Sequence, residues 1–281
     1  MRFYSAIGQV LGICLLLAGC GVGVEPIGTP NQLVQADELR LRYDRITAAP
    51  VVNLVPPAQM QAHAQEALAN QLAAYQLAGV QRITALNDPQ LARLRRIFRQ
   101  VQHYTHLADW QIEIVLMDKP VFQAYTFGGQ SVVFYTGLTK KLSDAQLAAV
   151  IGHELAHIAA GHIGESQSRD IVNTGTTNAL ESGPLAGFYA LADESEADAV
   201  GLVYATLAGY PPHEMAAFWA NQARIGGPRL VNLLADTHPT DASRAKRLSA
   251  IADKLDGFVE VLSEAEKQAA VRCNPVYCAK E

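Results

Sequence analysis

The strongest constraint on the fold of this chain is a helix-forming segment that carries two histidines four residues apart. Ser143 precedes the segment and Gln146 follows three residues later, which is the arrangement of a helix capping box. Further along the same segment come His153 and His157. Residues four apart differ by only about 40° around a helix axis, so both imidazoles project from one face. The rest of the chain must fold so that other elements meet that face.

The residues around the two histidines match a zinc-binding pattern. They read His153-Glu154-Leu155-Ala156-His157, in which both imidazoles bind one zinc ion and the carboxylate of Glu154 flanks it. Zinc lowers the pKa of a bound water molecule to about 7, and Glu154 is placed to accept a proton as that water attacks a peptide carbonyl. The pattern predicts one zinc ion per chain, with Glu154 as catalytic base. The alternative is a structural pair of histidines.

A catalytic zinc ion usually has three protein ligands and one open position, so this site needs a third ligand. In metzincins a third histidine follows the second by six residues, with glycine at the third position. Here Gly161 and His162 fall at the fourth and fifth positions, which excludes that arrangement. His162 is out of register with the ligand face, and we expect it to have a structural or hydrogen-bonding role rather than to bind metal. The other source of a ligand is a carboxylate from a later helix.

The acidic segment from Asp193 to Asp198 supplies such a carboxylate. Glu194 and Asp198 are four apart and share a helix face, whereas Glu196 lies about 200° from Glu194 around the axis and faces elsewhere. We predict that Glu194 is the third zinc ligand and that Asp198 accepts a hydrogen bond from a ligating histidine. The alternative for this segment is an acidic helix face exposed to solvent.

Together these segments resemble a known family. The sequence HELAHIAAGH from His153 to His162, followed by Glu194 and Asp198 in an EAD context, is similar to the gluzincins that include HtpX, the CAAX prenyl protease and the periplasmic beta-barrel assembly-enhancing proteases. The likeness covers about residues 85–255. It implies an α+β, mostly helical, zincin-like metalloprotease domain with a small antiparallel edge sheet beside the helix that bears the histidines.

The resemblance implies two further groups of site residues. Gln123, Ala124 and Tyr125 match the edge strand on which the family binds substrate backbone, although the family commonly has Asn where Gln123 stands. Downstream, His238 matches a histidine that in some relatives approaches the zinc ion, to stabilise the oxyanion or to occupy the open site; otherwise it only begins a helix. Arg244 is expected to anchor nearby carboxylates or to lie exposed on that helix.

The N-terminal residues indicate export. An apolar run from Ala6 to Leu17 is too short to span a bilayer, which is typical of a signal peptide. Small residues then lead to Cys20 and resemble a bacterial lipoprotein signal; an ordinary signal peptide is the alternative. We expect residues 1–19 to be removed, Cys20 to be lipidated and residues 20–57 to form a flexible tether. The residue after the cysteine is Gly21, and in this respect the sequence resembles lipoproteins that are anchored in the outer membrane and face the periplasm.

Residues 58–257 are expected to form the zinc metalloprotease domain. Apolar periodicity predicts packing helices, and short β-favouring runs predict a small, mostly antiparallel sheet. The segment 164–190 is rich in Gly, Ser, Thr and Asn, which predicts a partly ordered loop or lid. The expected helices cover residues 58–78, 88–106, 191–207, 212–224 and 240–254, and the expected strands cover residues 111–117, 121–127 and 132–135.

The last two cysteines belong to a separate tail at residues 258–281. An exported chain meets oxidising conditions, so Cys273 and Cys278 are predicted to form a disulfide that closes a small loop. Free thiols are the alternative.

Two hypotheses follow for function. The first is a zinc endopeptidase of the bacterial envelope that degrades misfolded or misassembled exported and outer-membrane proteins, with the membrane and an envelope assembly machinery as further partners. The second is a zinc-stabilised chaperone or assembly factor with little proteolysis. Glu154 favours the enzyme, because a protein that only binds needs no general base. The formal net charge is −5 and no run of Lys and Arg occurs, so nucleic acid is not an expected partner.

Overall fold

The computed structural model describes residues 53–174, 189–225, 243–257 and 259–271, together with Arg42, Tyr43, Ile46, Pro50 and Val51. Cys20, His238, Cys273 and Cys278 lie outside the described residues, as does the part of the predicted lid at 175–188. Within the described residues no helix is long and apolar enough to cross a membrane.

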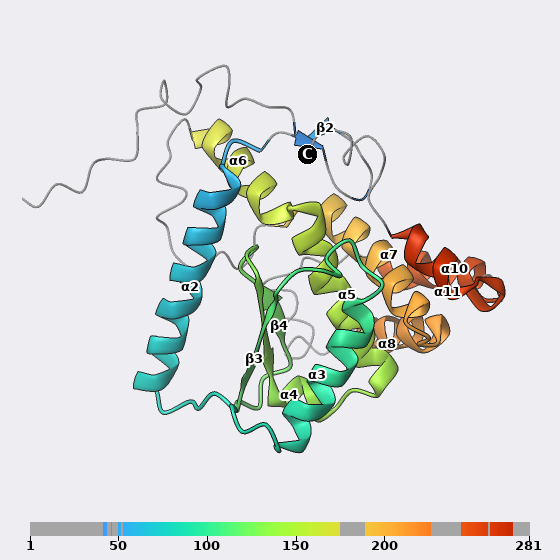
Figure 1. Cartoon of the computed structure of the whole chain (residues 1–281), viewed down its shortest axis with the longest axis horizontal. Coiled ribbons are helices and arrows are strands. Elements are labelled where there is room, and N and C mark those ends of the chain that lie inside the picture. Colours follow the sequence, from blue (N-terminus) through green and yellow to red (C-terminus); the bar gives the residue numbers. More distant parts are fainter. Residues whose placement is uncertain are drawn as a thin grey trace, which may run out of the picture.

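The described elements confirm the predicted α+β, mostly helical fold (Figure 1). Two short strands come first, β1 (Arg42–Tyr43) and β2 (Pro50–Val51), and they pair antiparallel. The strands of the main sheet are β3 (Glu113–Met117), β4 (Ala124–Thr126) and β5 (Ser131–Tyr135). The helices are α2 (Pro57–Leu77), α3 (Pro89–Gln102), α4 (Thr136–Thr139), α5 (Asp144–Ala160), α6 (His162–Thr174), α7 (Leu191–Leu207), α8 (Pro212–Ile225), α10 (Arg244–Leu255) and α11 (Glu264–Ala270), with a 3-10 turn at Val259–Val261.

The main sheet is mixed, so the predicted antiparallel sheet is wrong in one of its two pairings. The strand order is β3-β5-β4; β4 pairs antiparallel with β5, whereas β3 pairs parallel with β5. The hairpin at Gly128, where φ is +79°, reverses the chain between β4 and β5. Strand β5 therefore runs in the direction of β3, and placing it between the other two strands makes its pairing with β3 parallel. This order leaves β4 at the edge of the sheet.

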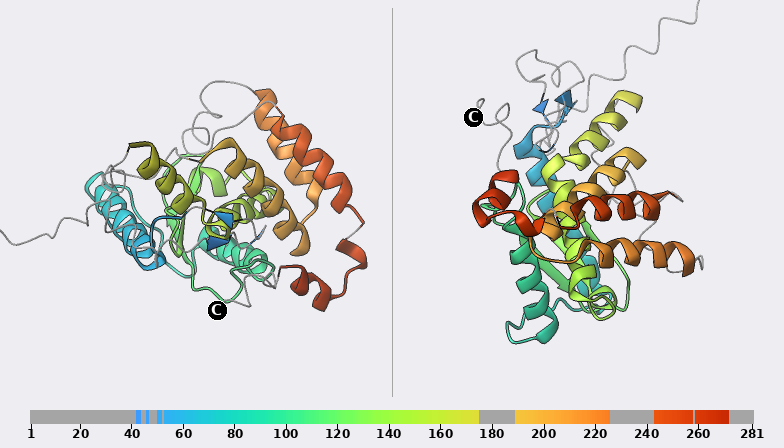
Figure 2. Two further views of the ribbon diagram at one scale, coloured as in Figure 1. Left: turned by 90° about the horizontal axis from the view of Figure 1, so that it is seen from above. Right: turned by 90° about the vertical axis from the view of Figure 1, so that its right-hand side faces the viewer.

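The sheet lies between two layers of helices (Figure 1). Alternate residues of β5 point to opposite faces: Val133 and Tyr135 join a buried cluster with Ala64 and Leu68 of α2. The other face, represented by Phe134, belongs to the main core, which includes α3, α5 and α7. Helix α5 is buried along nearly its whole length because it packs between the sheet and α7. Beyond α7, helices α8 and α10 lie side by side (Figure 2).

Helices α5 and α7 approach each other unusually closely, and two glycines make this possible. A Cβ built on Gly201 of α7 would lie 2.5 Å from the backbone N of His153, and one built on Gly152 of α5 would overlap the carbonyl oxygen of Gly201. Any larger side chain at either position would separate the two helices. The close crossing brings the N-terminal half of α7 to the histidine face of α5.

The predicted lid begins with a helix, so the loop prediction is wrong for residues 164–174. Helix α6 starts directly after Gly161, which has a left-handed φ of +80° and ends α5. The polar composition of α6 indicated a loop, but Ser168 of this helix has both a local and a tertiary hydrogen-bond partner. The Ser168 hydroxyl donates to the carbonyl of Gly164 at 2.6 Å and accepts from the backbone N–H of Leu54 at 2.8 Å. These bonds let a Ser-rich helix pack while its hydroxyls stay satisfied.

Candidate metal centre

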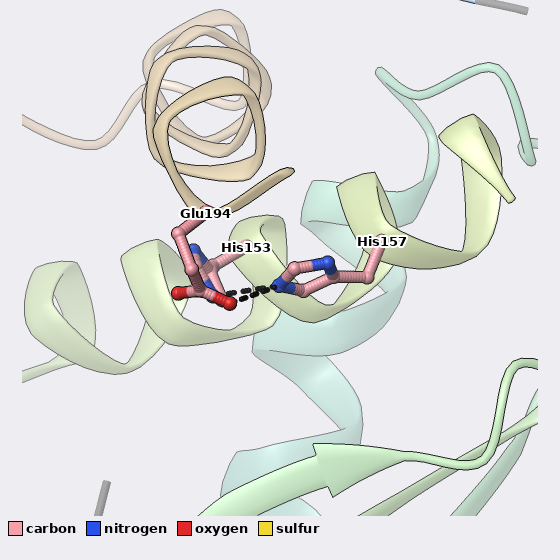
Figure 3. A group of neighbouring side chains, drawn as sticks. All are labelled: His153, His157 and Glu194. Atoms are coloured by element: carbon pink, nitrogen blue, oxygen red, sulfur yellow. Dashed lines mark hydrogen bonds and ion pairs between the residues drawn. The ribbon is translucent and has the colours of Figure 1, made fainter. Parts of the chain in front are cut away.

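Three predicted metal ligands converge between α5 and α7 (Figure 3). His153 and His157 extend from one face of α5, and Glu194 reaches them from the first turn of α7. The two Nε2 atoms are 3.0 Å apart, and the Glu194 carboxylate oxygens lie 3.5 Å from Nε2 of His153 and 3.3 Å from Nε2 of His157. Among the described residues, these three form the one group of His, Cys, Asp or Glu side chains able to hold a metal ion.

The donor set fits zinc in both chemistry and spacing. Two imidazole nitrogens and one carboxylate oxygen form a common catalytic zinc set, and metal–ligand bonds of about 2.0–2.1 Å in a tetrahedron put neighbouring ligand atoms about 3.3 Å apart. The two Nε2 atoms are 3.0 Å apart, and one Glu194 oxygen lies 3.5 Å from Nε2 of His153 while the other lies 3.3 Å from Nε2 of His157. All three side chains are at most 6% exposed, so their ligand atoms face one another in a buried site. A shared cation satisfies such a group of electron-rich atoms.

Behind His153 stands a buried ion pair that connects α7 with α10. The Nδ1 atom of His153 lies 3.1 Å from Oδ1 of Asp198, and the guanidinium of Arg244 donates to the same oxygen at 2.5 Å. Asp198 and Arg244 are 6% and 5% exposed, so the alternatives of a solvent-facing acidic helix and an exposed arginine are wrong at these positions. A carboxylate at Nδ1 favours the tautomer whose Nε2 lone pair is available to a metal ion.

Comparison with known proteins identifies the family. The sequence profile of Peptidase family M48 matches residues 89–252, which is more than half of the chain and contains every described residue of the metal centre. The chain belongs to peptidase family M48. This result confirms the resemblance found in the sequence and the predicted dependence on zinc, since M48 peptidases are zinc metallopeptidases.

The M48 relatives include mitochondrial and bacterial proteins. The chain is 28% identical to the mitochondrial metalloendopeptidase OMA1 of Arabidopsis thaliana, with 52% of this chain and 32% of the relative covered. It is 26% identical to the beta-barrel assembly-enhancing protease of Escherichia coli K12, covering 57% and 38%, and 25% identical to the metalloprotease LoiP of the same strain, covering 48% and 60%. The chain thus spans about a third of the length of the first two relatives.

The M48 site also contains an aromatic residue that the sequence analysis missed. Tyr189 lies two residues before the start of α7, and its ring stacks on the imidazole of His157, with centroids 3.8 Å apart and planes inclined by 18°. Burial raises the pKa of the Tyr189 phenol well above its usual value, and the negative charges of Glu154 and Glu194 raise it further. Glu154, which follows His153 directly on α5, is itself 1% exposed. The only sequence signal for Tyr189 is its place just before the acidic helix.

The edge strand lies beside the metal-binding helix. Ala124 and Tyr125 belong to β4, which contacts α5, while Gln123 directly precedes the strand. The carbonyl of Gln123 accepts from the backbone N–H of Tyr135 at 3.3 Å, so it points into the sheet. In an antiparallel ladder the next residue points its N–H and C=O away from the partner strand. The backbone polar groups of Ala124, which is 0% exposed, therefore point away from β5.

Proposed function

We propose that this chain is a zinc metalloendopeptidase whose ligands are His153, His157 and Glu194 and whose general base is Glu154. The convergence of three buried donors, whose ligand atoms lie within 4.8 Å of one another, carries this proposal. When bound, zinc would act as a Lewis acid that polarises a peptide carbonyl, and it would make a bound water molecule more acidic. Glu154 accepts the proton of that water and later delivers it to the nitrogen of the departing amine.

The neighbouring residues have orienting and regulatory roles in this proposal. Asp198 accepts the Nδ1–H of His153, and Arg244 neutralises Asp198 so that a buried carboxylate is tolerated. His238, from the family resemblance, acts at the fourth position of the metal site, where it stabilises the oxyanion or blocks the resting site. Asp198 and Arg244 are 6% and 5% exposed, and this burial supports a role for Asp198 as acceptor and for Arg244 as its neutralising cation.

The substrate class follows from the edge strand. We propose that an extended polypeptide adds along the edge strand at Gln123, Ala124 and Tyr125. Recognition through backbone groups suits unfolded or misassembled polypeptides, because only an extended segment presents a continuous row of such groups. The contact between β4 and α5 supports this, since a peptide added there lies close to the metal ligands.

The proposed setting is the bacterial outer membrane on its periplasmic side. A lipid on Cys20 anchors the protein, the residues that follow it link the anchor to the protease domain, and a disulfide joins Cys273 to Cys278. The similarity to the beta-barrel assembly-enhancing protease favours substrates among misassembled outer-membrane proteins and contact with an envelope assembly machinery. Labelling with palmitate in a bacterial host tests the anchor: label on the wild type should be absent from Cys20→Ala.

Proteolysis is tested with the full chain purified in detergent and unfolded casein as substrate. We expect cleavage that stops with a chelator and returns with zinc, and a loss of about 10²–10⁴-fold in rate for Glu154→Gln with zinc content unchanged. Zinc-dependent cutting that survives Glu154→Gln would refute the assignment of the base. The chaperone alternative predicts that wild type and Glu154→Gln suppress casein aggregation equally without cutting it.

A further inference from the structure

The second ring nitrogen of His157 faces another buried histidine. Nε2 of His157 belongs to the metal centre, and its Nδ1 lies 2.8 Å from Nδ1 of His162, the first residue of α6. His162 is 2% exposed, and its own Nε2 lies 3.7 Å from a carboxylate oxygen of Glu196 on α7. Three side chains from three helices thus form a row that begins at a metal ligand.

When a metal is bound, only one of the two histidines can be the donor of the hydrogen bond between them. A neutral imidazole that offers its Nε2 lone pair to a metal ion carries its proton on Nδ1. His157 must then donate from Nδ1, and Nδ1 of His162 must accept. His162 consequently carries its proton on Nε2, which is the nitrogen beside the negative charge of Glu196. The position of Glu196 therefore favours the tautomer of His162 that the metal site requires.

Stacking on Tyr189 does not determine which way round the His157 ring lies. Rotating the His157 ring by half a turn about its Cβ–Cγ bond leaves the ring plane unchanged, so the stack on Tyr189 is the same in both orientations. That rotation replaces Nε2 by a carbon at the metal position and Nδ1 by a carbon opposite His162. The hydrogen bond to His162 is made in one orientation only, the one that presents Nε2 to Glu194.

We infer that His162 is a positioning residue for the metal ligand His157, with Glu196 setting its tautomer. The inference rests on the proposed role of His157 as a ligand. The two ligating histidines are then oriented by different means: His153 by the Asp198 carboxylate directly, and His157 through a second imidazole. The left-handed Gly161 allows this, because it turns the chain so that the residue after α5 folds back onto the ligand face.

Zinc affinity of the full chain in detergent, measured by competition with a chromophoric chelator, tests the inference. We expect His162→Leu to weaken zinc binding about 10–100-fold, the usual effect of losing an orienting partner of a ligand. His162→Asn places its amide oxygen where Nδ1 stands and should bind within about threefold of wild type. His162→Gln carries its amide one atom farther out, cannot accept at that point, and should bind as weakly as His162→Leu.

Two further measurements separate positioning from general packing. His106→Leu is the matched control, because it removes another imidazole that hydrogen-bonds to α7, through the hydroxyl of Tyr204 at 2.6 Å, away from the metal centre. Its zinc affinity should stay at the wild-type value. The absorption spectrum of the cobalt-substituted protein should change for His162→Leu and remain as in wild type for His162→Asn. Glu196→Leu should lower zinc affinity, but less than His162→Leu does. An unchanged zinc affinity in Glu196→Leu would show that Glu196 does not set the tautomer of His162.

Equal zinc affinity in His162→Leu and wild type would overturn the role of His162, as would a His162→Asn variant as weak as His162→Gln. If His162→Leu does not fold, the comparison between the Asn and Gln variants decides alone. His157→Ala and Glu194→Ala report separately on the ligand assignment. Should both keep wild-type zinc affinity, the proposed metal site fails; should both lose zinc while His162→Leu does not, only the positioning role fails.

Discussion

Replacing Gly201 by alanine tests whether the close crossing of α5 and α7 positions the metal ligands. The added Cβ would lie 2.5 Å from the backbone N of His153 and 2.8 Å from the carbonyl carbon of Gly152. Favourable contacts between such atoms need about 3.5–4.0 Å. The obstruction is the backbone of α5, so no rotamer change relieves it. Helix α7 must therefore move away from α5 by about 1 Å.

The expected effect of Gly201→Ala on zinc binding and catalytic rate depends on the position of Glu194 on α7. It lies seven residues before Gly201, almost two full turns, and so projects from the same face of α7. Its oxygens are 3.3 and 3.5 Å from the histidine nitrogens, and a shift of about 1 Å at a catalytic site costs on the order of 10²-fold in rate. Overpacking costs about 1–3 kcal/mol of stability, of which up to about 1 kcal/mol is offset because alanine favours a helix more than glycine does.

Gly164→Ala is the matched control for this substitution. It also adds one Cβ to a glycine within a helix, but the three atoms nearest to that Cβ belong to the side-chain amide of Asn53, which can move. Gly201→Ala should bind zinc at least tenfold more weakly and cut casein about 10²-fold more slowly, while Gly164→Ala should match wild type in both. Wild-type zinc affinity and activity in Gly201→Ala, with the protein folded by circular dichroism, would show that the glycine crossing does not set the position of Glu194.

Three further predictions concern charge and metal. Arg244→Leu leaves Asp198 buried without its cation, so the free energy of unfolding should fall by about 3–5 kcal/mol in urea titrations, more than for Arg96→Leu at the surface. The hydrogen bond from Arg96 lowers the pKa of Asp144, so this contribution to stability is present above about pH 4 and is lost as the pH falls through the lowered value; Asp144→Asn should lack that acid loss in urea midpoints. Chelation of zinc should lower the thermal midpoint, with recovery on adding zinc, because a ligand at about 100 times its Kd adds about 2.7 kcal/mol.

Local signals in the sequence were sufficient for the two helices of the site. The predicted capping box is present at α5: the hydroxyl of Ser143 accepts from the N–H of Gln146 at 3.2 Å, and the Gln146 side chain accepts from the N–H of Ser143 at 3.1 Å. The predicted range 191–207 matches α7 as observed. Spacing alone placed His153 and His157 on one face and turned Glu196 away from Glu194. These features depend on residues within a few positions of one another.

Features that depend on distant contacts could not be predicted in the same way. The parallel pairing of β3 with β5 depends on which side of the β4–β5 hairpin meets β3, and no local pattern records that choice. Helix α6 was predicted as a loop because its partner, the backbone of Leu54, lies more than a hundred residues earlier. Likewise, nothing next to Arg244 in the sequence indicates that it is buried, since its carboxylate partner lies on α7.

The groups that contact the site histidines are clustered at the start of α7 and just before it. Tyr189, Glu194, Glu196 and Asp198 lie within ten residues, and each meets a histidine at or just after α5. A single docking of α7 against α5 therefore assembles the ligands and their orienting groups together, and separation of the two helices removes them together. Zinc that bridges α5 and α7 must stabilise this docking by its binding free energy, because the separated helices offer no complete site. Hydrogen exchange of the buried amides of α7 should accordingly slow when zinc is added, while that of the amides of α2, which packs on the far face of the sheet, should change less.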